Sequence, residues 1–312
     1  MQPVQYVSVA NIISDDLILS DGERRLGLLG GAGTYAAAGM RLWSDAVGIV
    51  SGVGEDFDAL LGGWFRQNGI DTRGLDVRAP QTPHSTINYA SDDDRVEDPQ
   101  FGPEHFKRME PTLADLPPVY HKARGLYLFR DANPAYWDLV YAFQATATRR
   151  PIIVWELHTG AADARQWDAA AAILARIDLV SLNIAEARAL CGLAEPRDIV
   201  RKLLATGVSA VALRLGAEGT IAADQHVMWR IPIYPVEVMD VTGAGNAFTG
   251  GFLVGYCMSG GDVRRAGCWG AAAASFMLEQ FGPPRCIDAA LEHEARRRAD
   301  RLEPIRLNQT TL

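Results

Sequence analysis

Apolar segments of strand length alternate with amphipathic or alanine-rich segments of helix length along almost the whole chain. The apolar segments are rich in β-branched residues and nearly continuous, as expected for parallel strands that are covered on both faces. We expect strands at 4–10, 45–52, 123–129, 151–156, 177–183 and 209–216. We expect helices at 33–43, 55–69, 133–147, 163–177 and 184–192. The alternation predicts an α/β fold, a three-layer α/β/α sandwich with a mostly parallel sheet, formed by residues 1–312 as a single domain.

Two segments interrupt this alternation. Residues 15–31 contain two apolar pieces around Ser20-Asp21-Gly22, which is a hairpin signal, and residues 84–102 repeat the pattern around Ser91-Asp92-Asp93-Asp94. We expect one small β-sheet that forms a lid over the carboxyl edge of the main sheet, where open α/β sheets bind ligands. Two surface hairpins without a function are the alternative. Apolar edge strands in such a lid would also favour a homodimer through the lid.

The composition excludes several classes of partner. A formal charge of −8 argues against broad binding to nucleic acid or to anionic membranes. No segment approaches the roughly 18 apolar residues of a membrane span, and the first residues lack the basic and apolar regions of a signal peptide. The four cysteines form no CxxC pair and indicate reduced thiols of a cytoplasmic protein. The basic stretch 294–303 indicates a solvated helix face.

The segment DVTGAGNAF (240–248) predicts a strand, a tight turn and the start of a helix. The first backbone N–H groups of a helix have no acceptor within the helix, and the helix dipole points the same way. Such a helix start attracts anions, phosphate groups above all. The residue at its edge, Asn246, is a neutral amide.

Five motifs in the right order carry a resemblance to the ribokinase (PfkB) family of carbohydrate and nucleoside kinases over almost the whole chain. They are GGAGTYAAAGMRLW (30–43), VGIVSGVGEDFDALLGGWFRQNGID (47–71), LNIAEARALCG (182–192), LRLGAEG (213–219) and DVTGAGNAFTGGFLVGY (240–256). The resemblance implies a ribokinase-like fold that binds ATP with Mg²⁺ and a small-molecule sugar or nucleoside substrate. The activity it implies is phosphoryl transfer to a hydroxyl group.

The resemblance also assigns substrate-binding residues. Asp16 resembles the sugar-binding aspartate at the start of the first lid strand, and Asn11 an asparagine at the end of the first strand. The glycines that let the backbone approach the sugar are matched by Gly30, Gly31 and Gly33. Tyr35 stands where the family often has an asparagine.

On the nucleotide side, Glu186 resembles the glutamate that holds a hydrated Mg²⁺, with Asn183 beside it. The alternative is a helix cap, in which Asn183 and Glu186 form a capping box. Arg214 stands where the family frequently has threonine, and it could reach nucleotide phosphates or pair with an acid. Gly216 and Gly219 are expected to shape the turn under the nucleotide.

In the family, the residue at position 246 is an aspartate that takes the proton from the substrate hydroxyl. Gly243, Ala244 and Gly245 retain the anion-binding turn, but Asn246 can orient a hydroxyl without accepting its proton. General base catalysis contributes about 10²–10⁴-fold, so the change predicts a slow kinase or one with a different base. The candidates for that base are Glu156 and His158, after the expected strand 151–156.

Three accounts of Asn246 are open. It belongs to a divergent natural branch, similar to the fungal Mak32-like proteins, or it is an introduced change, or the chain is a catalytically silent protein that binds nucleotide or sugar. Tyr35, Arg214 and VWELHTG (154–160), where sugar kinases often show Asp-Pro-Asn, favour natural divergence.

Overall fold

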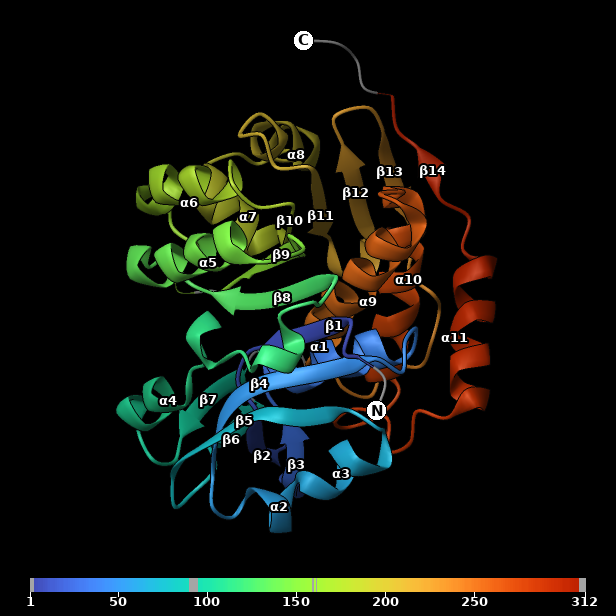
Figure 1. Cartoon of the computed structure of the whole chain (residues 1–312). Coiled ribbons are helices and arrows are strands. Elements are labelled where there is room, and N and C mark those ends of the chain that lie inside the picture. Colours follow the sequence, from blue (N-terminus) through green and yellow to red (C-terminus); the bar gives the residue numbers. More distant parts are fainter. Residues whose placement is uncertain (1–2, 90–94, 159, 161, 309–312) are drawn as a thin grey trace.

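A ten-stranded sheet forms the centre of the computed structural model, which describes residues 3–89, 95–158, 160 and 162–308 (Figure 1). Its parallel strands are, in sheet order, β11 (Ala210–Arg214), β10 (Leu179–Asn183), β9 (Ile152–Leu157), β8 (Gly125–Arg130), β1 (Tyr6–Val9), β4 (Val47–Gly54) and β5 (Asp71–Ala79). Three antiparallel strands extend one edge: β12 (Thr220–Asp224), β13 (Met228–Ile231) and β14 (Ile305–Arg306). The strands predicted from the apolar segments are confirmed, with small shifts in their bounds.

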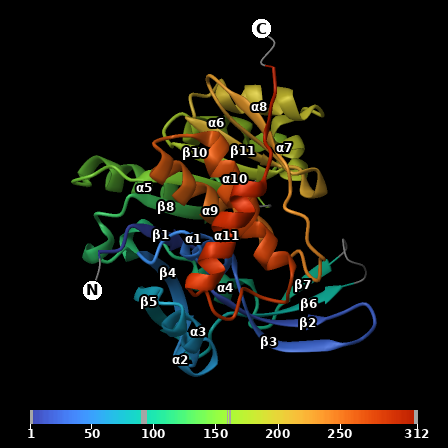
Figure 2. The same cartoon turned by 90° about the vertical axis from the view of Figure 1, so that its right-hand side faces the viewer.

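Helices cover both faces of this sheet and bury a separate apolar core against each face. One face packs against α1 (Ala32–Arg41), α9 (Ala244–Ser259), α10 (Val263–Leu278) and α11 (Ala289–Arg301); Figure 2 shows the last three in front of the sheet. The other face packs against α5 (Pro134–Thr146), α6 (Trp167–Leu174), α7 (Ile184–Cys191) and α8 (Pro196–Leu204). The predicted α/β/α sandwich is therefore confirmed.

One predicted helix is divided. The segment expected as a helix over 55–69 forms α2 (Phe57–Leu60) and α3 (Gly62–Gln67), with the break at Leu61. Gly62 and Gly63 follow the break, and glycine is a poor helix former, which explains the interruption. The remaining helices are short: α4 (Pro103–Met109) and the 3₁₀ helices η1 (Leu113–Asp115), η2 (Pro118–Tyr120), η4 (Ala164–Gln166) and η5 (Gly216–Glu218).

A second, four-stranded sheet lies beside the main one, in the order β3-β2-β6-β7. It contains β2 (Ile13–Ile18), β3 (Arg24–Gly30), β6 (His84–Tyr89) and β7 (Arg95–Pro99). Each sequential pair is antiparallel, and β2 joins β6 in parallel, so both hairpins belong to one sheet (Figure 2). The turn expected at Ser91–Asp94 lies outside the described residues.

No described helix is long and apolar enough to cross a membrane. The four cysteines, Cys191, Cys257, Cys268 and Cys286, are free thiols, as expected.

Helices α1 and α9 cross with almost no side-chain volume between them. A Cβ atom on Gly39 would lie 2.1 Å from the carbonyl oxygen of Ala247, and one on Gly250 would lie 2.2 Å from that of Ala36. Both distances are far below van der Waals contact, so only glycine allows this crossing. The crossing fixes where α9 begins, at the carboxyl edge of the sheet.

We predict that Gly250→Ala destabilises the protein, by about 1–3 kcal/mol, because the added methyl group must push α9 away from α1. Gly63→Ala in α3 is the control, since a Cβ atom there meets nothing within 4 Å and alanine is the better helix former. Urea unfolding of the two variants measures the difference. Equal midpoints would contradict the assignment of Gly250 as a packing glycine.

Candidate functional site

A cavity of about 980 Å³ opens at the carboxyl ends of the parallel strands. Four consecutive strands of the sheet each contribute a polar residue at or near their last position: Arg130 of β8, Glu156 of β9, Asn183 of β10 and Arg214 of β11. The small sheet closes one side, and α10 and the segment 232–238 form the opposite end. The cavity is therefore at the edge where an open α/β sheet is expected to bind its ligand.

The turn before α9 faces this cavity. Residues Gly243, Ala244, Gly245 and Asn246 all line it. The backbone N–H of Ala244 donates to the carbonyl oxygen of Val241 at 3.4 Å, and the amides of Gly245 and Asn246 follow in the first turn of α9, where no acceptor exists within the helix. The start of α9 is therefore suited to bind an anion. Gly243 has a φ angle of 74°, and a Cβ atom on it would lie 2.1 Å from Cγ of Tyr35. The ring of Tyr35, on α1, therefore packs directly against this glycine.

Asp240 holds the turn in place from the segment before it. The strand expected directly before this turn is not formed, because residues 232–241 are neither helix nor strand. Its buried carboxylate accepts hydrogen bonds from the backbone N–H of Thr242 at 2.9 Å and from the hydroxyl of Thr242 at 2.8 Å. The same oxygen accepts a hydrogen bond from the hydroxyl of Tyr89, the last residue of β6, at 3.0 Å. A residue of the small sheet is thus bonded to the anion-binding turn.

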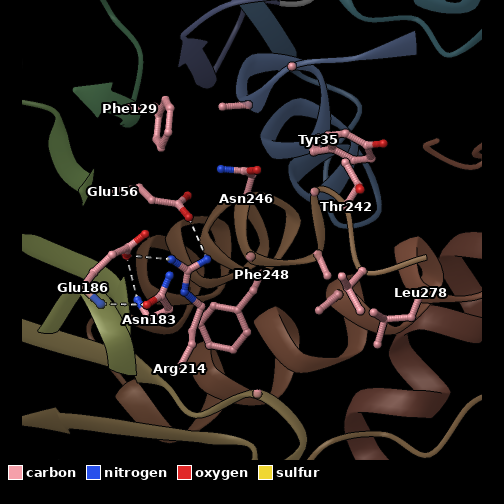
Figure 3. Close-up of a pocket in the computed structure, with 18 of the residues that line it drawn as sticks. Tyr35, Phe129, Glu156, Asn183, Glu186, Arg214, Thr242, Asn246, Phe248 and Leu278 are labelled. Carbon is pink, nitrogen blue, oxygen red and sulfur yellow. Dashed lines mark hydrogen bonds and ion pairs between the residues drawn. The ribbon is translucent and has the colours of Figure 1, made fainter. Parts of the chain in front are cut away.

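Asn246 belongs to a chain of polar contacts that runs across the strand ends. Its side-chain amide donates to the hydroxyl of Tyr127 at 3.0 Å, and that hydroxyl donates to Oε2 of Glu156 at 2.8 Å. Oε1 of Glu156 forms an ion pair with Nη1 of Arg214 at 2.7 Å. Arg214 also lies 3.9 Å from a carboxylate oxygen of Glu186 (Figure 3).

Tyr127 remains a proton donor in this chain. Complete burial, and then the adjacent Glu156 carboxylate, raise the pKa of Tyr127 well above its ordinary value. The phenol is therefore protonated at neutral pH, and it donates to Glu156 while it accepts from Asn246. This arrangement uses both hydrogen-bonding capacities of the hydroxyl.

Arg214 pairs with an acid, which was one of its two predicted roles. Its guanidinium lies against the anion-binding turn, because a Cβ atom on Gly245 would be 1.9 Å from Nη1 of Arg214. A positive charge consequently lies beside the free amides of α9. Phosphate oxygens that bound to this turn would also reach Arg214.

Asn183 and Glu186 form the capping box that was the alternative interpretation of this pair. The side chain of Asn183 accepts from the backbone N–H of Glu186, and that of Glu186 accepts from the backbone N–H of Asn183, each at 2.9 Å. Both residues also line the cavity. No group of three or more metal-binding side chains occurs in the described part of the chain. This donor set fits a cation that arrives with the phosphates and its own waters, and it does not fit a cage made by the protein.

Asp15 of β2 lines the cavity beside the small sheet, and Asp16 is not among the lining residues. Asp16 accepts from the backbone N–H of Gly27 at 2.8 Å and lies 3.2 Å from Nε2 of His84, on the other face of β2. Ile13 and Asp15 both line the cavity, as residues two apart on a strand share a face. Asp15 therefore occupies the place in the cavity wall that was expected for Asp16, and the alternation along β2 was the signal that could have found it.

The other predicted glycine and asparagine positions divide into lining and packing residues. Asn11, Gly31, Gly216 and Gly219 line the cavity. Gly30 leaves room for the Asp15 carboxylate, since a Cβ atom there would lie 1.7 Å from Oδ2 of Asp15. Gly33 lies against the end of β1, with its Cβ position 2.5 Å from the carbonyl oxygen of Ala10.

The sequence analysis also missed residues that support the site through hydrogen bonds, among them Tyr127, Tyr89 and Arg298. Arg298 is on α11, in the stretch expected to be solvated, yet it is buried. It donates to the hydroxyl of Ser275, a cavity residue on α10, and pairs with Glu279. The guanidinium of Arg298 also lies over the ring of Phe276, 3.9 Å from its centroid. A run of basic residues in the sequence does not predict these contacts.

Comparisons with known proteins identify relatives of this chain. The family model described as pfkB family carbohydrate kinase matches residues 23–290. A cytidine kinase of Thermococcus kodakarensis is 26% identical over 273 residues, which cover 81% of this chain and 88% of that protein. An uncharacterized protein of Schizosaccharomyces pombe is 24% identical over 90% of this chain and 86% of its own length.

Solved structures show the same fold. A chain from Escherichia coli assigned as a ribokinase II, in complex with ATP and Mg²⁺, has a TM-score of 0.76 at 19% identity and covers 96% of this chain and 99% of its own. The adenosine kinase of Sinorhizobium meliloti has a TM-score of 0.76 at 18% identity, covering 95% and 99%.

We predict that Arg214→Met destabilises the protein by about 3–5 kcal/mol, because it leaves the buried Glu156 carboxylate without its charge partner. The double variant Arg214→Met/Glu156→Gln should recover much of this loss, since the uncompensated charge is gone. Arg66→Met is the matched control: it breaks an exposed pair with Asp58 and should cost at most about 1 kcal/mol. Urea unfolding measures all three, and an additive double variant would show that the pair is not coupled.

Proposed function

Because the chain belongs to the pfkB family of carbohydrate kinases, we propose that it transfers the γ-phosphoryl group of ATP to a hydroxyl of a small sugar or nucleoside-like acceptor. The observation that carries the proposal is the start of α9, where free amides and the guanidinium of Arg214 face one cavity. Phosphoryl transfer depends mainly on positioning and on stabilising negative charge, and these groups can do both.

The nucleotide occupies the end of the cavity near α10 in this proposal. Small and apolar side chains there leave a slot for a planar base: Ala271, Ala274 and Leu278 on α10, and Ile233 and Val238 opposite. Gly216 and Gly219 lie between this slot and Arg214 in the sequence and along the cavity wall. The phosphates would then run from the glycine turn toward the start of α9.

The acceptor occupies the other end, under the small sheet. Asp15 can accept hydrogen bonds from acceptor hydroxyls, and Asn11 and the backbone at Gly31 lie beside it. The apolar side chains of Ile13, Ile87 and Phe129 line the same end. A polar edge facing an apolar wall suits a sugar or a nucleoside, whose ring has both kinds of surface.

Mg²⁺ would enter with the nucleotide, and Glu186 and Asn183 would hold it through its water ligands. When bound, it neutralises phosphate charge. Glu186 remains engaged in the cap of α7 and near Arg214, so its role is to orient the hydrated ion and not to strip its waters.

A catalytically silent binding protein is the second candidate. Asn246 favours it, because an amide cannot accept the proton of an attacking hydroxyl. Such a protein would keep nucleotide affinity and lack turnover.

A panel of sugars and nucleosides, assayed for ADP release with ATP and Mg²⁺, tests the kinase proposal. We expect at least one acceptor to raise ADP release above the rate with ATP alone, because the phosphate-binding elements are intact. Nucleotide binding without turnover on any acceptor would favour the silent protein. Without Mg²⁺ the rate should collapse. Glu186→Gln, which can retain the capping box, should raise the Mg²⁺ concentration needed for half-maximal activity.

We also propose that two copies of the chain pair through the small sheet. Its outer strands β3 and β7 present the exposed side chains of Leu26 and Val96, and unpaired strand edges favour association. Light scattering should give a dimer that Leu26→Lys/Val96→Lys weakens. A wild-type monomer at micromolar concentration would contradict the pairing.

A further inference from the structure

Position 246 has no carboxylate, but the carboxylate of Glu156 is connected to Asn246 through the hydroxyl of Tyr127. Asn246 and Glu156 lie on opposite sides of the Tyr127 hydroxyl, which accepts from the first and donates to the second. We propose that Glu156 is the proton acceptor of the phosphoryl transfer and that Asn246, through Tyr127, positions it. This inference rests on the proposed kinase function and assigns its general base.

Glu156 lies where such a base is needed. Its Oε1 atom is 3.6 Å from the position that a Cβ atom on Gly245 would take, so the carboxylate lies beside the first turn of α9. It lines the cavity and is buried, and Figure 3 shows it projecting toward Asn246 and Arg214. An acceptor hydroxyl aligned with a phosphoryl group on this turn would be close to both Asn246 and Glu156.

The other groups near the turn are poorer acceptors. Tyr127 holds its proton, because burial and Glu156 raise its pKa well above the ordinary value. His158 is exposed, its Nδ1 accepts from the backbone N–H of Gly160 at 3.1 Å, and its ring packs against Phe129. Glu186 is committed to the cap of α7. Of the two bases that the sequence left open, the geometry favours Glu156.

Arg214 links proton transfer to the arrival of the nucleotide. Its guanidinium pairs with Oε1 of Glu156 and lies against Gly245, so phosphate oxygens on the turn compete with Glu156 for it. A shift of Arg214 toward the phosphates would leave Oε1 of Glu156 free to accept a hydrogen bond from the acceptor hydroxyl. The positive charge then stabilises the transferring group.

The reaction balances with these groups alone. The acceptor O–H bond breaks and its proton passes to Glu156, while the acceptor oxygen forms a bond to the γ-phosphorus. The bond from that phosphorus to the β–γ bridging oxygen breaks, and ADP leaves with the electron pair. Protonated Glu156 returns its proton to solvent when the products leave.

The hydrogen-bond pattern permits a direct test by exchange of the two side chains. In the double variant Glu156→Gln/Asn246→Asp, the new amide at position 156 can donate to Tyr127, and Tyr127 can donate to the new carboxylate at position 246. The oxygen of that new amide still faces Arg214. Both hydrogen bonds of the Tyr127 hydroxyl are kept with their direction reversed, Arg214 still donates to an oxygen at position 156, and the carboxylate now lies on the other side of Tyr127.

We expect Glu156→Gln to lower turnover by about 10²–10⁴-fold with little change in ATP affinity. The double variant Glu156→Gln/Asn246→Asp should recover turnover to within about tenfold of wild type. If Glu156 had only a structural role, moving its carboxylate to position 246 would not restore turnover. Asn246→Asp alone should change turnover by less than about tenfold. Asp58→Asn, which removes an exposed carboxylate far from the cavity residues, is the control and should leave turnover unchanged.

Turnover is measured as ADP release with ATP, Mg²⁺ and the best acceptor of the panel, or with water as acceptor if no panel member reacts. Unfolding midpoints and ATP binding confirm that each variant is folded. A wild-type-like rate for Glu156→Gln overturns the inference, as does a rise of 10²-fold or more for Asn246→Asp. If Glu156→Gln does not fold, the test uses the double variant Glu156→Gln/Asn246→Asp. The inference is overturned if that variant folds and binds ATP but its turnover remains 10²-fold or more below that of wild type. Wild-type protein that binds ATP and transfers to nothing, water included, refutes the kinase function itself.

Discussion

The close crossing of α1 and α9 is the constraint on which the rest of the site depends. Gly39 and Gly250 bring the two backbones into contact, so the start of α9 has one position relative to α1. That start carries the glycine turn, while Gly31, at the N-terminal end of α1, lines the same cavity. Tyr35 completes the contact by packing against Gly243. One pair of helices therefore positions both the proposed phosphate-binding turn and a part of the proposed acceptor site.

Asn246 is part of a network of polar side chains that extends across the strand ends. A carboxylate at Glu156 and a guanidinium at Arg214 form a buried pair beside the same turn. Because an unpaired buried charge is expensive, removing one of these two residues is expected to lower the stability of the fold. Tyr127 connects the pair to Asn246, so the neutral amide is the hydrogen-bonding complement of the phenol and of Glu156. These residues form a single polar unit.

The sequence predicted the layers, the parallel strands and the turn before α9, because these follow from local patterns of apolar residues and glycines. It did not predict which side chains meet. Tyr127 is indistinguishable from a core residue within the apolar strand 125–130, and its partners Glu156 and Asn246 are 29 and 119 residues away. Asp15 and Asp16 occupy opposite faces of β2, and only the packing of the small sheet over the cavity decides which face lines it. Arg298 looked solvated because its partners Ser275 and Glu279 come from another helix.

The bond between Tyr89 and Asp240 gives the small sheet a thermodynamic connection to the turn before α9. Asp240 is buried and accepts from Thr242 as well, so a movement of β6 that withdraws the Tyr89 hydroxyl changes the hydrogen bonding of the residue that shapes the turn. An acceptor that draws the small sheet down over the cavity would thereby stabilise the turn that binds phosphate. Linkage is reciprocal: a nucleotide that stabilises the turn must favour the closed small sheet by the same free energy. If both proposed ligands bind, the Tyr89 hydroxyl is therefore a contact through which each would affect the affinity of the other.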